Sequence, residues 1–218
     1  MSHQVNSRRA YRSKTRQDQA RRTRVAVLAA ASTLFATKGY AATTMSAIAS
    51  DAGVAVDTVY AAVGSKPQLL RTLIETAVSG TSGPLPPEQR AWVREIQAAS
   101  TAQEKLRLYA RTVRQIHDRM GPLLVVLREA AERSEELAEL ASTLRTRRAD
   151  NMRRFAREVA STGELRPGLT VEEMADVVWA MNSAEFYSLL VRERGWTPDQ
   201  YETWLADSWV RLFVSKPA

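Results

Sequence analysis

The side chains of this sequence that could bind another molecule are mostly cationic, and they are unevenly placed. The 218 residues carry a net charge of +7. Residues 1–24 hold eight arginines and lysines against one acidic residue, Asp18, so this basic segment accounts for the whole excess. Its cationic residues are Arg8, Arg9, Arg12, Lys14, Arg16, Arg21, Arg22 and Arg24. Such clustering predicts salt-dependent binding to a polyanion. A solvated tail and a membrane-surface arm are the alternatives, and the scarcity of apolar residues in 1–16 disfavours the membrane.

One pairing suggests catalysis, namely His117 beside Asp118. A histidine activated by a carboxylate needs a nucleophile or a metal before it can do chemistry. The sequence offers no cysteine, no Gly-rich phosphate loop, and only one other histidine, His3. We therefore expect no enzyme activity, no cofactor and no metal site, and we interpret His117 as a core or pocket-lining residue.

Composition also indicates where the protein acts. Without cysteine there are no disulfides and no thiol chemistry. No run of 18 or more apolar residues occurs, and the N-terminus is polar and basic, so neither a membrane span nor a secretory signal is expected. These features predict a cytoplasmic protein with no membrane partner.

Residues 43–66 predict two short helices joined by a tight turn. Apolar residues recur every three or four positions on both sides of Gly53, which suits the left-handed end of a helix. Thr44 is a good N-cap for the first helix, and Ser65 with Gln68 forms a capping box for the helix that follows. An ordinary helical hairpin has the same periodicity, but the basic segment upstream favours a DNA-binding helix-turn-helix.

The rest of the chain also predicts helices, because no stretch of strand length alternates apolar and polar residues. The Gly- and Pro-rich residues 80–88 mark a domain boundary. We expect a disordered basic arm (1–16), a helix-turn-helix domain (17–80) and a helical effector-binding and dimerisation domain (81–218). The expected helices are about 17–38, 45–52, 56–63, 66–79, 90–98, 101–120, 123–133, 135–161, 170–194 and 198–214, with a break or kink at Gly121-Pro122. The fold class is all-α, with a three-helix head and about nine or ten helices in all.

Two C-terminal segments, 171–192 and 198–214, carry more apolar and aromatic residues than one buried face requires. A helix of this kind must be covered on more than one side. We therefore expect a homodimer in which these two helices form an isologous four-helix contact. The alternative is a single large monomeric core.

Residues 24–73 contain a set of residues that is specific as a whole. It comprises Ala30, Leu34-Phe35, Gly39-Tyr40, Thr43-Thr44-Met45, Ile48-Ala49, Ala52-Gly53-Val54, Thr58-Val59-Tyr60, Ser65-Lys66 and Leu69-Leu70. In these residues the stretch resembles the DNA-binding head of the tetracycline-repressor (TetR) family. The resemblance implies a transcriptional regulator, most simply a homodimeric repressor that a small-molecule effector releases from a palindromic double-stranded DNA operator.

The resemblance also implies individual roles. Thr44 and Lys66 would contact phosphates, and Tyr60 would contact the backbone or a base methyl group. The recognition helix would present Val56, Asp57, Thr58 and Ala61 to the major groove. From the basic segment, we expect Arg21, Arg22 and Arg24 to contact DNA as well.

Three positions depart from the family pattern. Ala55 stands where a capping serine is usual, Ala62 where a larger phosphate-contacting residue often occurs, and Val63 where phenylalanine is usual. The reading face is therefore small and apolar, so thymine methyl groups, DNA shape and the basic segment are expected to carry much of the recognition.

The second domain would hold the effector pocket. The candidate lining residues are His117, Met120, Leu124, Arg128, Trp179, Asn182 and Phe186. Asn182 stands out as an amide in an apolar helix, with a hydrogen bond across the dimer as the alternative role. Arg128 could pair with an acidic ligand or with the neighbouring Glu129 and Glu132.

Two other hypotheses stay open. The basic segment alone would suit an architectural nucleic-acid-binding protein without effector control. A helical enzyme or a protein-interaction module is the third hypothesis, and the missing catalytic constellation argues against the enzyme.

Overall fold

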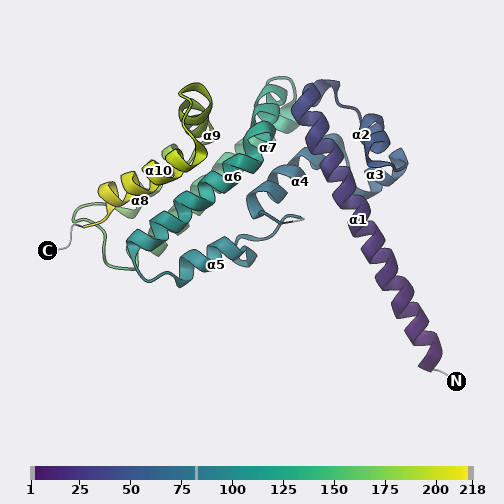
Figure 1. Cartoon of the computed structure of the whole chain (residues 1–218), viewed down its shortest axis with the longest axis horizontal. Coiled ribbons are helices and arrows are strands. Elements are labelled where there is room, and N and C mark those ends of the chain that lie inside the picture. The colour runs from purple at the N-terminus through teal and green to yellow at the C-terminus, as the bar shows by residue number, and fades with distance from the viewer. Residues whose placement is uncertain (1–2, 82, 216–218) are drawn as a thin grey trace.

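The computed structural model describes residues 3–81 and 83–215, and for residues 3–16 it describes the backbone only. In these described residues ten α-helices follow one another (Figure 1): α1 (His3–Ala42), α2 (Met45–Ala52), α3 (Val56–Val63), α4 (Lys66–Ser79), α5 (Ala91–Ala98), α6 (Ala102–Ala131), α7 (Glu135–Ala160), α8 (Val171–Met181), α9 (Ala184–Tyr187) and α10 (Pro198–Phe213). A 3₁₀ turn, η1 (Pro87–Gln89), precedes α5, and a π-helix, η2 (Ser188–Glu193), follows α9. The described residues contain no strand, which confirms the all-α class.

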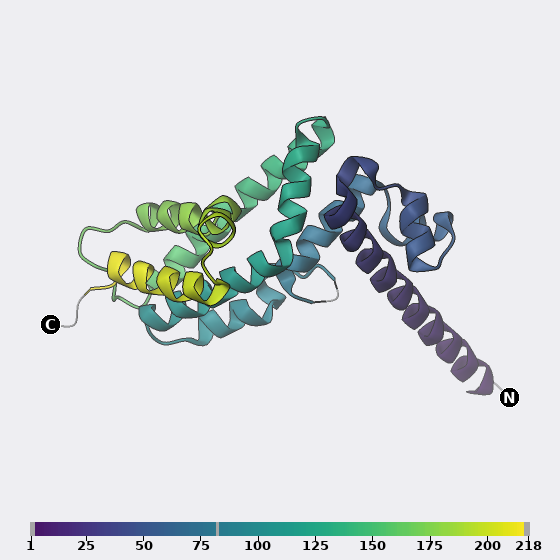
Figure 2. The same cartoon turned by 45° about the horizontal axis from the view of Figure 1, so that its top comes forward.

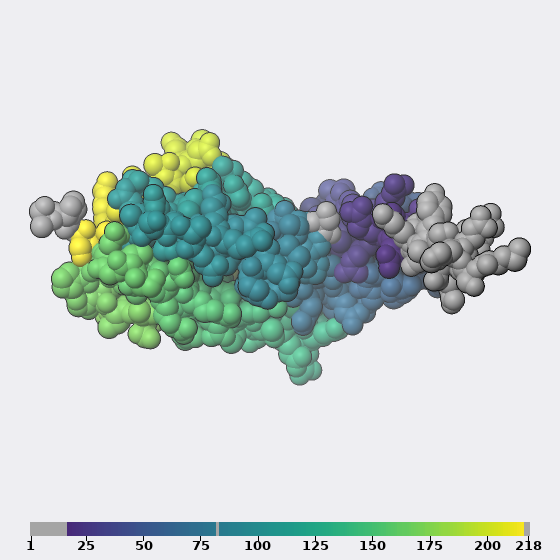
Figure 3. Space-filling model, turned by 90° about the horizontal axis from the view of Figure 1, so that it is seen from below, coloured from purple at the N-terminus to yellow at the C-terminus, as the bar shows by residue number. Residues whose placement is uncertain are grey.

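The helices form a small head, α1–α4, and a larger body, α5–α10. In Figures 1 and 2 the first part of α1 projects beyond the head, and α6 and α7 run side by side through the body. The linker 80–90 and α5 lie on one face of the molecule, which Figure 3 views directly. This linker contains the glycines and prolines from which the domain boundary is predicted.

Helix α1 begins earlier than expected. The sequence predicts a start at Gln17 after a disordered arm, whereas the backbone is helical from His3, and residues 1–2 lie outside the described part. Residues 3–16 contain no glycine or proline and several good helix formers, so nothing in their sequence stops the helix. The helix is kinked at its other end by Gly39, whose φ of 75° is left-handed.

By length and composition, Gln17–Ala42 could cross a membrane, with a mean hydropathy of 1.3. The same composition suits a helix that packs against several neighbours. Val27, Ala31 and Phe35 have no exposed surface, because α2, α3 and α4 cover them. Packing within the head therefore accounts for this buried face of α1.

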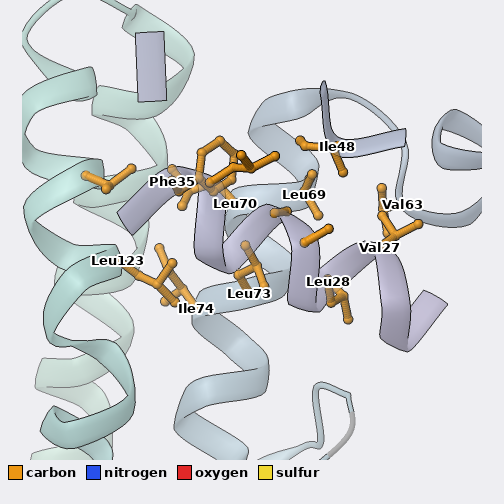
Figure 4. Close-up of a cluster of buried hydrophobic side chains, with 14 of the residues drawn as sticks. Val27, Leu28, Phe35, Ile48, Val63, Leu69, Leu70, Leu73, Ile74 and Leu123 are labelled. Atoms are coloured by element: carbon orange, nitrogen blue, oxygen red, sulfur yellow. The ribbon is translucent and has the colours of Figure 1, made fainter. Parts of the chain in front are cut away.

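The core of the head continues into the body. Figure 4 shows Phe35, Leu70 and Ile74 of the head beside Leu123, which belongs to α6. The same buried cluster includes Val126, Leu127 and Ala130 of α6 and Leu137 and Leu140 of α7. A second cluster fills the far half of the body, between α5, the first half of α6, α7, α8 and α10.

The sequence predicts a break or a kink in α6 at Gly121-Pro122. The helix does not break there but continues through both residues. Proline in a helix removes one backbone hydrogen bond and crowds the carbonyl four residues earlier, which bends a helix without having to end it. Figure 2 shows α6 changing direction along its length. Burial of Met120 and Leu123 on either side of the proline holds this long helix together.

The helix expected over 170–194 is divided. Helix α8 ends at Met181, and Ser183 caps α9 by accepting a hydrogen bond from the Phe186 amide. Three side chains from other helices bind the carbonyls at the end of α8. Arg148 donates to the backbone carbonyl of Trp179 (2.7 Å). Tyr201 donates to the carbonyl of Met181 (3.0 Å), and His117 donates to the carbonyl of Asn182 (3.0 Å). These partners come from α7, α10 and α6, so periodicity within the segment could not have revealed the break.

Candidate nucleic-acid interface

The turn between α2 and α3 is fixed at both ends by local hydrogen bonds. The Thr44 hydroxyl caps α2 by accepting from the Ala47 amide (3.0 Å). Gly53 ends α2 with a left-handed φ of 66°, and the Val54 amide then donates to the Ala49 carbonyl (3.0 Å). A residue with a side chain would be strained at Gly53. This geometry sets the angle at which α3 leaves the turn.

Helix α3 buries one face and exposes the other. Val59 and Val63 are buried in the head core, and Asp57, Thr58, Tyr60 and Ala61 are exposed. Tyr60 is 50% exposed, an unusual amount for a large ring on a packed domain.

Val56 differs from the other residues expected on the reading face. Its side chain is half-buried and packs against the head core. Ala55, which precedes the helix, makes no side-chain cap, as its methyl group dictates. The exposed surface of α3 therefore offers one carboxylate, one hydroxyl, one phenol and a methyl group to a partner.

Lys66 lies at the start of α4 and is held by an aromatic ring. Its ammonium group is 4.2 Å from the centroid of Tyr40, and Tyr40 stacks on Phe35 with centroids 5.5 Å apart. Partial burial lowers the pKa of Lys66 from its ordinary value. Burial, with a smaller effect of Glu136, raises the pKa of Tyr40 to about 12, so the phenol stays neutral. A cation–π contact fixes the ammonium at one place while its three donors stay available.

Arginines of the basic segment reach the head itself. Arg21 and Arg22 are exposed on α1, whereas Arg24 donates from its guanidinium to the Ala62 carbonyl near the end of α3. Arg24, which is expected to contact DNA, thus forms a hydrogen bond that stabilises the position of the recognition helix. The Thr44 hydroxyl, which accepts from a backbone amide, keeps its proton for a phosphate oxygen.

The expected effector-pocket residues are distributed over both clusters. Met120 and Leu124 belong with the head cluster, and Trp179 and Phe186 pack against the second cluster. Arg128 is exposed. Of the seven, the structure joins His117 and Asn182 by a hydrogen bond.

A buried polar network surrounds Asn182, which is 6% exposed. Its amide nitrogen donates to the Tyr109 hydroxyl (2.9 Å) and to the Met152 sulfur (2.9 Å). Its side-chain oxygen accepts from Arg148, whose guanidinium also lies 4.4 Å from the centroid of the Trp179 ring. Burial raises the pKa of Tyr109 far above its ordinary value. The amide is thus fully engaged within the chain.

The sequence pattern did not single out Arg148 and Tyr109 as members of this network. A signal was present for Arg148, since it stands four residues from Leu144 and from Met152, both at least half-buried, and so shares the inner face of α7. Tyr109 carried no comparable signal, because a tyrosine on the apolar face of a helix is ordinary.

A helix-turn-helix head with an exposed second helix, joined to a larger all-helical body, defines a class of DNA-binding transcriptional regulators. The comparisons agree. The family model for bacterial regulatory proteins of the tetR family matches residues 27–73. Within residues 27–73, the head of this chain is therefore similar to bacterial regulatory proteins of the tetR family. Comparison with curated protein sequences gives no match.

Solved structures share the fold over most of the chain. A transcriptional regulator from Saccharomonospora viridis, in complex with choline, is 20% identical, with a TM-score of 0.68 over 91% of this chain and 100% of that chain. NalD from Pseudomonas aeruginosa, the secondary repressor of the MexAB-OprM multidrug efflux pump, is 23% identical, with a TM-score of 0.63 over 88% and 96%. FadR from Bacillus halodurans, a fatty acid degradation regulator, is 14% identical, with a TM-score of 0.69 over 86% and 94%.

Replacing Lys66 tests the phosphate contact. Lys66→Ala should weaken binding to every DNA sequence, and the slope of log affinity against log salt should fall by about one. Fluorescence anisotropy at several salt concentrations measures both. Arg157→Ala removes one exposed charge from α7 and serves as the control. A slope unchanged in Lys66→Ala would exclude the phosphate role.

The buried His117 predicts a pH dependence of stability. Burial lowers its pKa to about 4, from 6.5 in an unfolded chain. The unfolded state therefore binds a proton first as the pH falls, and the histidine's stabilising contribution, complete above about pH 6.5, is lost towards pH 4. That loss amounts to about 2–3 kcal/mol. Urea unfolding at pH 7 and pH 4.5 should show a smaller pH-dependent loss in His117→Gln than in the parent, with His3→Gln as the control. Equal losses in all three proteins would contradict the assignment.

Proposed function

We propose that the chain is a homodimeric repressor that a small-molecule effector releases from a palindromic operator. The observation that carries the proposal is the exposed face of α3, set by the Gly53 turn on a head whose core runs on into a larger helical body. A two-fold dimer of such heads would place two recognition helices in successive major grooves, about 34–36 Å apart.

In this proposal the DNA contacts fall into two groups. Thr44, Lys66 and the exposed arginines Arg21 and Arg22 position the duplex through its phosphates. Asp57, Thr58, Tyr60 and Ala61 face the bases, with Val56 at the edge of the group and Arg24 supporting it from behind. Because this set has no arginine or asparagine aimed at base edges, groove shape and thymine methyl groups carry much of the specificity.

The dimer contact is proposed on α8 and α10. Helix α10 buries Tyr201, Leu205 and Trp209 inside the body and leaves Trp204 and Leu212 more than a third exposed. Val177 of α8 is 37% exposed and lines the same shallow pocket as Leu212. Apolar side chains gathered on two neighbouring helices are expected at an isologous interface.

The effector is proposed to bind in the body near His117 and Asn182. Support comes from NalD, a repressor, and from the Saccharomonospora viridis regulator in complex with choline. An effector acts only through unequal affinity for the DNA-binding and released conformations. The continuous core of α6 and the head gives such a difference a physical route to α3.

The remaining assignments follow from this function. The chain is proposed to comprise a basic arm (1–16), a DNA-binding domain (17–80) and an effector-binding and dimerisation domain (81–218), and to act in the cytoplasm without enzymatic activity or a cofactor. The alternative function, an architectural nucleic-acid-binding protein without effector control, draws on the basic segment.

A selection from random double-stranded oligonucleotides separates the two functions. The repressor should enrich a near-palindrome whose half-sites lie about one helical turn, or a multiple of it, apart. Sequencing after several rounds reads this out. An enriched pool without a two-fold motif would favour the architectural protein.

The dimer contact is tested by placing a charge on it. Leu212→Glu puts two carboxylates into a two-fold interface, which should raise the dimer dissociation constant at least about tenfold. Sedimentation equilibrium measures the constant, and Ala138→Glu, on the exposed side of α7, is the matched control. A Leu212→Glu protein that dimerises like the parent would rule out this face.

A further inference from the structure

A second pocket lies where the head meets the body, and its α7 residues adjoin Arg148 and Met152 of the Asn182 network. It has a volume of about 220 Å³. The linker segment 84–87 and Arg90 form one wall, Glu75 of α4 contributes another, and Arg147 and Asn151 of α7 complete it. The linker and α5 are at the surface on the face shown in Figure 3.

Arg90 is the unusual residue of this pocket. It is 9% exposed, and its Nε donates to the Leu85 carbonyl (3.0 Å). Its guanidinium carbon lies 5.8 Å from the centroid of the Trp92 ring. Within residues 3–81 and 83–215, its two terminal nitrogens make no hydrogen bond or ion pair. Burial and the neighbouring Arg147 lower the pKa of Arg90, but a guanidinium remains charged at any physiological pH. The carboxylates of Glu75 and Glu88 act on Arg90 without forming an ion pair among the described residues, so its terminal nitrogens keep donors for an anionic ligand from outside the chain.

The charges around Arg90 leave room for such a partner. Arg147 pairs with Glu75 at 3.0 Å, and this guanidinium is about half exposed. Two guanidiniums therefore line the pocket against one carboxylate, which is already engaged. Asn151 adds an amide that can donate. Guanidinium groups bind carboxylates and phosphates through paired hydrogen bonds, so this donor set matches an oxyanion.

The opposite wall is rigid and apolar. Pro84, Pro86 and Pro87 fix their own φ angles and have no amide hydrogen, and Leu85 lies between them. Hydrogen bonds of Ser79 and Thr81 to the Gly83 carbonyl (2.8 and 2.7 Å) hold the start of the linker against the end of α4. A preformed wall of this kind reduces the entropy lost when a ligand binds.

We propose that this pocket binds a small oxyanion, a carboxylate or a phosphate, through the terminal nitrogens of Arg90, with Arg147 and Asn151 as further donors. The ligand competes with Glu75 for Arg147. Because Glu75 belongs to α4 and Arg147 to α7, binding loosens an ion pair between the head and the body. The oxyanion and DNA are then linked ligands of one protein.

Calorimetric titration of the full-length protein tests the site without DNA. Sodium benzoate and sodium phosphate are titrated separately, up to millimolar concentration, in a Tris-chloride buffer. Heat of binding is expected with at least one of them. Binding of benzoate alone indicates a carboxylate with an apolar body resting on the prolines, and binding of phosphate indicates a compact oxyanion. No heat with either anion would overturn the proposal.

Variants with opposite expected effects on anion affinity distinguish the loss of a contact from unfolding of the protein. Arg90→Gln and Arg147→Gln should each lower the affinity for the anion at least about tenfold, which is the equivalent of one charge-assisted hydrogen bond. Glu75→Gln should instead strengthen binding, since it removes the competing carboxylate. Arg145→Gln, exposed on α7 and outside the pocket, is the matched control. Unchanged affinity in both arginine variants, or weaker binding in Glu75→Gln, would overturn the site.

The linkage between anion binding and DNA binding is tested by measuring DNA affinity. DNA affinity should change by about fivefold or more between no anion and saturating anion, and Arg90→Gln should abolish that change. Equal DNA affinities in the parent protein with and without the anion would refute the linkage. Because the calorimetry contains no DNA, this outcome is distinguishable from a failure of the proposed repressor function.

Discussion

The structure depends on one apolar contact, the packing of the second half of α6 against α1 and α4. Leu123 and its neighbours on α6 are buried in the same cluster as Phe35 and Ile74 of the head. Arg119 of α6 adds a hydrogen bond to the Ala77 carbonyl of α4 (2.8 Å). Close-packed interiors resist small displacements, so the head cannot turn freely on the linker. A movement of α6 is transmitted to the head through this packing.

Compared with this extensive packing, the recognition helix α3 is short and offers few groups for recognition. Helix α3 is two turns long, and its outer face carries few groups that can read a base edge. Three local contacts fix the position of α3 and of the residues around it. They are the Gly53 turn, the hydrogen bond of Arg24 to Ala62 and the cation–π contact of Lys66 with Tyr40, and all three restrict where the head can meet a duplex. In the proposed function, positioning of the duplex is therefore better provided for than base reading, and the basic residues 1–24 would add attraction that does not depend on DNA sequence.

Local signals in the sequence were sufficient for α2, α3 and α4 of the head and insufficient for the start of α1 and for the body. Capping residues such as Thr44 and Ser65, together with the glycine turn, act over three or four residues, so α2, α3 and α4 begin and end where they were expected. The end of α8 depends on side chains from three other helices, which no local pattern reveals. Burial of Arg90 likewise follows from the meeting of linker, α4 and α7. The residues that line a site between helices can be inferred only once the helices are placed.

The clamped end of α8 also constrains the order in which the chain can fold. His117 precedes Asn182 by 65 positions, and Tyr201 follows Met181 by 20. Contacts between residues so far apart form late, because the intervening loop must first be closed. During synthesis the head and the first half of the body can therefore assemble before α8 has a defined end. The bend between α8 and α9 becomes fixed only when α10 has left the ribosome, so a regulator truncated before α10 would retain its DNA-binding head while the surface around α8 stayed unfinished.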